Sequence, residues 1–207
     1  MKTAINIIMK TCINIFILML SAYAFGQYPI LSTSSLANGR DDPNFTKDGN
    51  YAVDANNERD QYIGLWRYEN DAALFELKIL KNDQYLNAAV YNGQILHYNY
   101  CDEVRLQYKL VKNGITLNNN LYFIGPQSND SYGIKQGIDD YMDGSILDHT
   151  RNVLVSYTIK RLPGIPAKIR FALNPNVYTL LNHRDYYNDG ELLFNIPLGE
   201  IEMVKVD

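Results

Sequence analysis

The stretch YIGLWRYENDAALFELKILK, residues 62–81, decides the fold class that we expect for this chain. It contains the only tryptophan, Trp66, two residues after Gly64. Phe75 and Leu77 then alternate with charged neighbours, and a period of two is typical of a strand with one buried face and one wet face. The stretch therefore predicts the first β-hairpin of the chain.

The rest of the chain carries the same strand-and-turn pattern. Asn92-Gly93 and Asn113-Gly114 each separate two strand-like segments, and Asn-Gly favours the tight turns of β-hairpins. Residues 103–112 alternate most regularly. Further strands are expected at 84–91, 94–100, 115–123, 152–161, 167–173, 191–196 and 200–206. About nine or ten strands without an amphipathic helix indicate an all-β barrel or sandwich.

Residues 1–26 have the three parts of a secretory signal. Two lysines precede the apolar run at 13–20, and small residues allow cleavage after Ala24 or Gly26. The apolar run is too short to span a bilayer, and no later stretch is apolar enough, so we expect no stable membrane insertion. The sequence predicts a cleaved signal peptide and a periplasmic or extracellular protein.

The charge balance argues against a nucleic-acid binder. The 19 basic side chains fall to 17 when the two lysines of the signal are removed, against 23 acidic side chains, so the mature chain has a formal charge of −6. A protein that binds a phosphate backbone needs a basic surface. We therefore expect no nucleic-acid partner.

Cys101 is the only cysteine after the signal, which excludes an intramolecular disulfide. A lone cysteine in a strand is most often a small buried hydrophobe. The alternative is a nucleophilic thiol, for which His97 is the one base nearby in sequence.

Gly64-Leu65-Trp66, at the entry to the first strand, resembles the G-x-W signature of lipocalin-like barrels. In that family the tryptophan closes one end of an eight-stranded barrel, and the open end takes an apolar ligand. The T-D-Y signature of the family is missing, and only Lys205 in the last strand could stack on Trp66. The resemblance implies an antiparallel, lipocalin-like up-and-down barrel of about 8–10 strands, closed by Gly64 and Trp66.

The barrel is expected to be preceded by a polar segment. Residues 27–61 are rich in Ser, Asn, Asp and Gly, which predicts a partly ordered polar leader with one helical turn at 54–60. Residues 62–207 then form a single β-barrel domain, because a mature chain of about 180 residues suffices for one core.

The chain also resembles an uncharacterised family of small exported bacterial proteins, catalogued as a domain of unknown function. The likeness lies in YPIL at 28–31, DANNERD at 54–60, YIGLW at 62–66 and LFNIP at 193–197. The middle of the chain departs from it. The resemblance implies export and a β-fold, and it leaves the function open.

Catalytic motifs are missing from the sequence. It contains no G-x-S-x-G, no H-E-x-x-H, no glycine loop for phosphate and no C-x-x-C. The three histidines lie on separate segments without the spacing of metal ligands. We therefore expect neither enzymatic activity nor a cofactor.

Residues 124–150 predict a long acidic loop, and two segments of the chain read D-x-Y-x-D-G. These segments share the first, fifth and glycine positions of a calcium loop but lack the glutamate at position twelve. Their candidate ligands are Asp139, Asp143, Asp185 and Asp189. Asp-Gly is also a favoured hairpin tip, and a turn is the simpler interpretation.

Two hypotheses for the function follow. In the first, the barrel binds a small apolar or amphipathic ligand in a cavity of a few hundred Å³. The side chains expected to line it are Phe75, Leu77, Leu106, Tyr108 and Tyr157. In the alternative, the interior is filled, and the protein is a surface interaction module that contacts protein or glycan through its loops.

Overall fold

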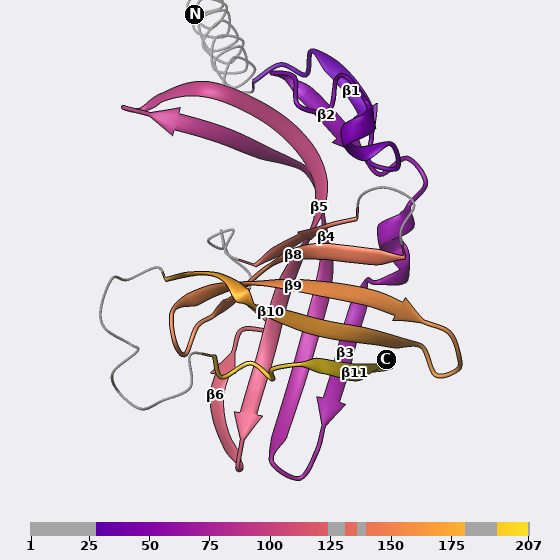
Figure 1. Ribbon diagram of the computed structural model, residues 1–207, viewed down its shortest axis with the longest axis vertical. Helices are drawn as coiled ribbons and strands as arrows, with labels where there is room; N and C mark the ends of the chain where they lie inside the picture. The colour runs from indigo at the N-terminus through magenta and orange to yellow at the C-terminus, as the bar shows by residue number, and fades with distance from the viewer. Residues whose placement is uncertain (1–27, 124–130, 136–139, 181–193, 207) are drawn as a thin grey trace, which may run out of the picture.

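The computed structural model describes residues 28–123, 131–135, 140–180 and 194–206, and these form eleven strands and two short 3-10 helices without any α-helix (Figure 1). The all-β class is confirmed. The strands are β1 (Ser32–Ser35), β2 (Asn50–Val53), β3 (Gly64–Glu69), β4 (Ala73–Tyr91), β5 (Gln94–Lys112), β6 (Ile115–Asn119), β7 (Tyr132–Ile134), β8 (Tyr141–Asp148), β9 (Val153–Leu162), β10 (Lys168–Leu180) and β11 (Glu200–Val206); the helices are η1 (Gly39–Asp41) and η2 (Glu58–Gln61).

Eight of the strands close a ring of antiparallel pairs. Its order is β3-β4-β5-β7-β8-β9-β10-β11, and β11 pairs back with β3. Each strand therefore lies beside the next ring strand in the chain. The other three strands attach to β5. β2 and β6 pair with β5 directly, and β1 pairs with β2.

Large side chains fill the inside of the ring. The centroid of the Phe75 side-chain ring lies 5.8 Å from that of Tyr108 and 5.6 Å from that of Phe171. Tyr157 stacks on Phe171 with their centroids 5.6 Å apart. All four side chains are buried. Burying one such side chain stabilises the fold by about 1.5–3 kcal/mol, so these contacts are a main source of stability.

Trp66 is fully buried and held from several sides. Its Nε1 donates a hydrogen bond to the carbonyl of Tyr62 at 2.7 Å, and the cations of Arg161 and Lys205 lie 5.5 and 5.6 Å from its ring. A Cβ on Gly64 would lie 2.7 Å from Cε of Lys205, and the φ of Gly64 is +134°. Glycine is needed there because residues with a side chain rarely adopt this φ, and the lysine stem also passes close to the backbone.

The expectation of a loop over 124–150 is wrong for most of the described part. β7 and β8 lie there, and Asp143-Gly144 sits inside β8 instead of at a turn. A Cβ on Gly144 would lie 1.9 Å from the carbonyl oxygen of Tyr132, and Tyr157 donates its hydroxyl to that oxygen at 3.0 Å. This glycine therefore permits close strand approach.

The strand expected at 191–196 is also not observed where it can be checked. Residues 194–196 are irregular, and 191–193 lie outside the described residues. The strand expected at 200–206 is confirmed as β11.

β4 and β5 are much longer than the ring requires. Their outer halves, residues 85–91 and 94–101, form a two-stranded ribbon that curves away from the ring (Figure 1). We call this ribbon the arm. Its tip is the Asn92-Gly93 turn, where both residues have positive φ, as the sequence predicts.

A β-bulge marks the base of the arm. The pairing passes from Asn82↔Glu103 to Tyr85↔Cys101, which leaves one extra residue in β4. Gln84 within this step has a φ of +52°. An extra residue bends its strand and increases the local twist, so the bulge accounts for the arm's departure from the ring.

Residues 28–61, which the composition predicts to be a polar leader, contain β1, η1, β2 and η2. β2 pairs in parallel with β5, and Leu36, Ala52 and Cys101 form a second small core. The segment is thus attached to the base of the arm. Within the described residues, no helix is both long and apolar enough to cross a bilayer.

The core assignment predicts a large difference between two leucines. Leu77→Ala, in the ring interior, is expected to lower the free energy of unfolding by about 3 kcal/mol, because it leaves a cavity. Leu96→Ala, at an arm position that is 67% exposed, is the matched control and is expected to cost less than about 0.5 kcal/mol. Urea denaturation measures both, and equal losses would contradict the assignment.

Candidate functional site

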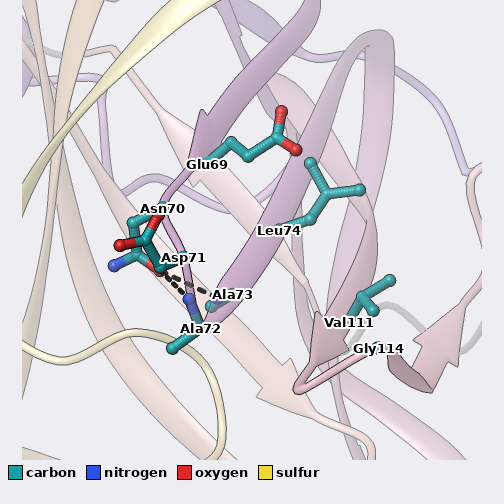
Figure 2. A pocket seen from close by; sticks show the side chains of 8 residues that line it. All are labelled: Glu69, Asn70, Asp71, Ala72, Ala73, Leu74, Val111 and Gly114. Atoms are coloured by element: carbon teal, nitrogen blue, oxygen red, sulfur yellow. Dashed lines mark hydrogen bonds between the residues drawn. The ribbon is translucent and has the colours of Figure 1, made fainter.

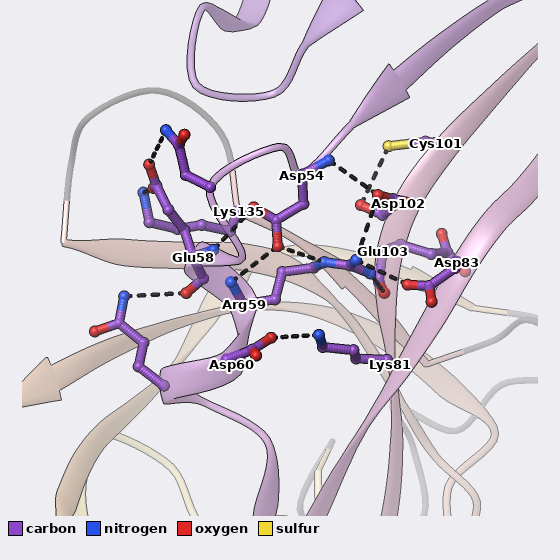
Figure 3. A network of polar contacts seen from close by, with 12 residues as sticks. Asp54, Glu58, Arg59, Asp60, Lys81, Asp83, Cys101, Asp102, Glu103 and Lys135 are labelled. Carbon is purple, nitrogen blue, oxygen red and sulfur yellow. Dashed lines mark hydrogen bonds and ion pairs between the residues drawn. The ribbon is translucent and has the colours of Figure 1, made fainter.

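The most extensive buried polar cluster among the described residues lies where η2, β2 and the base of the arm meet (Figure 3). We call this cluster the junction. Its central residues are Asp54, Arg59 and Asp102, which are 8%, 3% and 4% exposed.

The guanidinium of Arg59 is held on all sides. Nε donates to Asp54 at 2.9 Å, and one terminal nitrogen donates to the carbonyl of Glu103 at 2.7 Å. The other donates to Asp83 at 2.8 Å and lies 3.3 Å from Asp102. The planar fork of arginine suits this use, because one side chain reaches several acceptors in fixed directions.

Asp102 connects three parts of the chain. One oxygen accepts the hydroxyl of Tyr51 at 2.7 Å and the backbone N–H of Gln84 at 3.0 Å. The other accepts the N–H of Asp54 at 2.9 Å. Gln84 is the bulge residue, so Asp102 satisfies a donor at the bend and ties the arm to the segment that precedes the ring.

η2 forms because Asp54 satisfies its first donors. The carboxylate of Asp54 accepts the N–H groups of Glu58 at 2.9 Å and Arg59 at 3.1 Å. These groups have no partner inside a helix, and a side-chain carboxylate placed before the first turn takes that role. The same carboxylate therefore starts the helix and holds the arginine that the helix presents.

Two further ion pairs surround the junction. Lys81 of β4 pairs with Asp60, and the buried Lys135 pairs with Glu58 at 3.0 Å. Together they fasten both sides of η2 to the ring (Figure 3).

The electrostatics of the junction follow from burial and hydrogen bonding. Burial opposes ionisation of Asp54, but the hydrogen bonds from Arg59 and Glu58 outweigh it and hold the pKa of Asp54 below its usual value. Burial and the hydrogen bond to Asp102 raise the pKa of Tyr51, so this phenol stays protonated as a donor.

Glu103 is the exception in this cluster. It is 2% exposed, and burial raises its pKa to about 7 despite the hydrogen bond from Asn82 at 2.6 Å and the nearby charges of Arg105 and Arg59. Arg59 is already engaged by Asp54 and Asp102, which leaves Glu103 with incomplete compensation.

Cys101 borders the junction but is not activated. Burial raises the pKa of its thiol to about 12, and its Sγ lies 3.5 Å from the carbonyl of Asp102. Reactive cysteines have a lowered pKa. The geometry therefore supports the small buried hydrophobe over the nucleophile.

The junction is suited to holding chain segments in place. Its central carboxylates already accept several hydrogen bonds, and that of Asp102 joins segments that are far apart in the sequence. A pair of carboxylates poised for acid–base work would instead need access to a substrate. We read the junction as the device that sets the direction of the arm.

The five residues predicted to line a ligand cavity all lie in the core of the ring. Each is at most 2% exposed, and all belong to one cluster of mutually packed side chains. They are Phe75, Leu77, Leu106, Tyr108 and Tyr157. The structure brings them together, and a ligand between them stays a prediction.

Of the four aspartates predicted as calcium ligands, only Asp143 lies within the described residues. It accepts a hydrogen bond from Thr158 at 3.0 Å on the exposed side of β8 and β9. Asp139, Asp185 and Asp189 lie outside. Among the residues that the structure covers, no three acidic, histidine or cysteine side chains are placed to hold a metal ion.

A hollow of about 230 Å³ lies at the end of the β3–β4 hairpin, beside the β5–β6 turn (Figure 2). Small-molecule sites usually exceed 300 Å³. The side chain of Asn70 in this hollow accepts hydrogen bonds from the N–H groups of Ala72 and Ala73. These bonds stabilise the turn. The lining residues are Glu69, Asn70, Asp71, Ala72, Ala73, Leu74, Val111 and Gly114. The hollow is a by-product of two adjacent turns.

Sequence reasoning missed the junction, although one signal was present. Asp102 and Glu103 are consecutive charged residues in a strand, and successive side chains of a strand point to opposite faces. If one face of this strand is buried, one of the two carboxyl groups faces the interior, where a cation or hydrogen-bond donors must compensate it. Arg59 lies more than forty residues away, and nothing in the chain indicates that it is the partner.

Arg59→Met tests the junction. We expect it to lower the free energy of unfolding by about 3–5 kcal/mol, because two buried carboxylates lose their counter-charge. Arg170→Met is the matched control, since Arg170 is itself partly exposed and pairs with exposed Glu200 and Glu202; its replacement should cost less than about 1 kcal/mol. Urea denaturation measures both, and similar small losses would contradict a structural junction.

Glu103→Gln tests the raised pKa of Glu103. In the unfolded chain this carboxyl ionises near 4.5, whereas in the folded chain it ionises near 7. Its contribution to stability is therefore full below pH 4.5 and is lost as the pH rises to 7.

We expect the wild type to lose about 2–3 kcal/mol relative to Glu103→Gln between these limits. Urea denaturation of both proteins across this pH range measures the difference. A difference that is independent of pH would show that the carboxyl is not perturbed.

Comparison with known proteins gives a family and no further relative. No curated protein matches the chain. No solved structure matches it either. A family of unknown function, DUF6705, matches residues 9–206, nearly the whole length. The chain therefore belongs to the DUF6705 family.

Proposed function

We propose that this protein is an exported interaction module that contacts a protein partner through the arm. The observation that carries the proposal is the exposure of large apolar side chains at the end of the arm. Val90, Tyr91 and Leu96 are 60%, 65% and 67% exposed. A concentration of exposed apolar residues on a projecting element is typical of a protein contact surface.

The packing of the ring favours this function over ligand binding. An apolar ligand needs an interior volume, but the inward residues of β4, β5, β9 and β10 contact one another directly. Opening a cavity of a few hundred Å³ there would remove several buried contacts, each contributing to stability. The aliphatic character of Val90 and Leu96 also favours a protein surface over a glycan.

The ring is nevertheless lipocalin-like in this proposal, as a closed barrel with a filled interior. Its eight strands run in meander order, η2 precedes the first of them, and Lys205 of the last strand lies over Trp66. These features support the architecture that the G-x-W motif implies. The ring then acts as a rigid support.

The junction supports the function by orienting the arm. A two-stranded ribbon alone is marginally stable in water. Here β2 pairs with its base, Tyr98 and Tyr100 donate their hydroxyls to the carbonyls of Pro29 and Tyr28, and Tyr28 packs on Tyr98 at 5.1 Å. These contacts are expected to hold the arm ready for a partner and so reduce the entropy cost of binding.

Export completes the proposal and is supported by the signal at residues 1–26. Both predicted cleavage positions lie before Tyr28, where the described segment begins, so cleavage removes none of it. An exported module would present the arm outside the cytoplasm.

Site-specific photo-cross-linking tests this function. A benzoylphenylalanine replaces Tyr91, at the tip of the arm, and the control carries the same residue at Ile165, which is fully exposed in the β9–β10 turn. After irradiation of the producing cells, we expect a protein adduct at position 91 and none at 165. Leu96→Ser should reduce the yield. Equal adducts at both positions, or none at 91, would refute the arm as the contact surface.

A further inference from the structure

We infer that the outer edge of β4 in the arm, residues 86–91, pairs with the same edge of a second copy of the chain. This inference rests on the proposed function and names the partner. The two strands would run antiparallel and join the two arms into one continuous sheet.

The geometry of β4 leaves this edge open. β3 covers the outer edge of β4 only as far as Ile79, which pairs with Gly64. η2 covers the next step, where Asp60 and Arg59 pair with Lys81 and Asp83. Beyond that, no strand in the described part of the chain pairs with the outer side of residues 86–91.

The sequence of this edge lacks the usual protection. Natural edge strands are blocked by charges, proline or bulges, because their free N–H and C=O groups can pair with another strand. Residues 86–91 read LNAAVY and contain no charge and no proline. A strand of this kind is suited to strand addition.

A bulge does occur near the tip, but it does not interrupt this edge. The pairing passes from Ala89↔His97 to Val90↔Ile95, so the extra residue is Leu96 of β5. The outer edge of β4 stays regular.

Several features favour a second copy over another protein. Residues 84–100 contain no charged side chain except His97 in its protonated form, so two mature chains of formal charge −6 would meet through segments that do not repel each other. In antiparallel self-pairing around a two-fold axis, each residue meets a residue of the same face. Either Ala88 or Ala89 would then lie on the axis opposite its own copy, and its small side chain allows close approach.

The shape of the molecule agrees with this arrangement. The arm curves away from the ring, so two arms could meet without contact between the two rings (Figure 1). Val90 and Tyr91, which are exposed in one chain, would lie beside the partner strand and become partly covered. The pairing thus accounts for the exposed apolar tip.

Sedimentation velocity of the purified protein over a wide concentration range tests the inference. We expect a concentration-dependent dimer of the mature chain, from which the predicted signal has been removed. Of Ala88→Lys and Ala89→Lys, the variant at the residue on the two-fold axis should weaken the dimer at least about tenfold, because its two lysines face each other across the new pair, and the other variant should weaken it less. Ile165→Lys, a change at a fully exposed turn, should leave the dimer unchanged.

Mixing experiments make the test specific for edge pairing. The Lys variant at one of these two positions, mixed with the Asp variant at the same position, should form a heterodimer where the Lys variant alone does not. Circular dichroism should show the same strand content in all variants, since both alanines are exposed. Recovery on mixing supports the two-fold antiparallel arrangement.

Two results of sedimentation velocity would contradict edge pairing of the arm. A wild type that stays monomeric at every concentration, or a dimer that the arm variants do not weaken, would overturn the inference. A monomer that still forms an adduct with a different protein from position 91 would leave the proposed function standing and refute only the second copy as partner. A dimer without any adduct at position 91 would place the interface elsewhere.

Discussion

The ion pair between Arg59 and Asp102, together with Asp54, is the interaction on which the arrangement of this molecule depends. It is made by residues from η2, from β5 and from the segment after β2. The same carboxylate of Asp102 satisfies the N–H of Gln84 at the bulge. The charge pairing, the start of η2 and the bend of the arm are therefore one connected structure.

Such a buried cluster is better understood as specifying an arrangement than as adding stability. Removing charges from water is costly, and proteins in which apolar residues replace a buried ion pair are often as stable as the original. What the cluster provides is direction, because each hydrogen bond fixes an angle as well as a distance. Apolar packing is non-directional and is compatible with several placements of the N-terminal segment. The directed hydrogen bonds of the Arg59 guanidinium are compatible with one.

In a ligand-binding barrel, the same interior provides both the stability and the contact surface. In this protein the stabilising core lies in the ring, and the exposed apolar surface lies in the arm. The ring buries its aromatic side chains against one another, and in the proposed function it supports the arm. The arm keeps apolar side chains and a strand edge exposed, at a cost in solubility that natural proteins usually avoid. The exposed arm and the filled ring therefore both favour a function at the arm over one inside the ring.

The all-β class, most of the strands and the hairpin turns at Asn92-Gly93 and Asn113-Gly114 could be predicted from the amino-acid pattern, because alternation and turn chemistry are local properties. It also indicated that Trp66 and the inward residues would be buried. The tertiary structure was needed to place Asp143-Gly144 within a strand, because a side chain at Gly144 would collide with the carbonyl oxygen of Tyr132 on the neighbouring strand. It alone paired Arg59 with Asp102, because that contact joins residues far apart in the chain and depends on how the strands are placed in space.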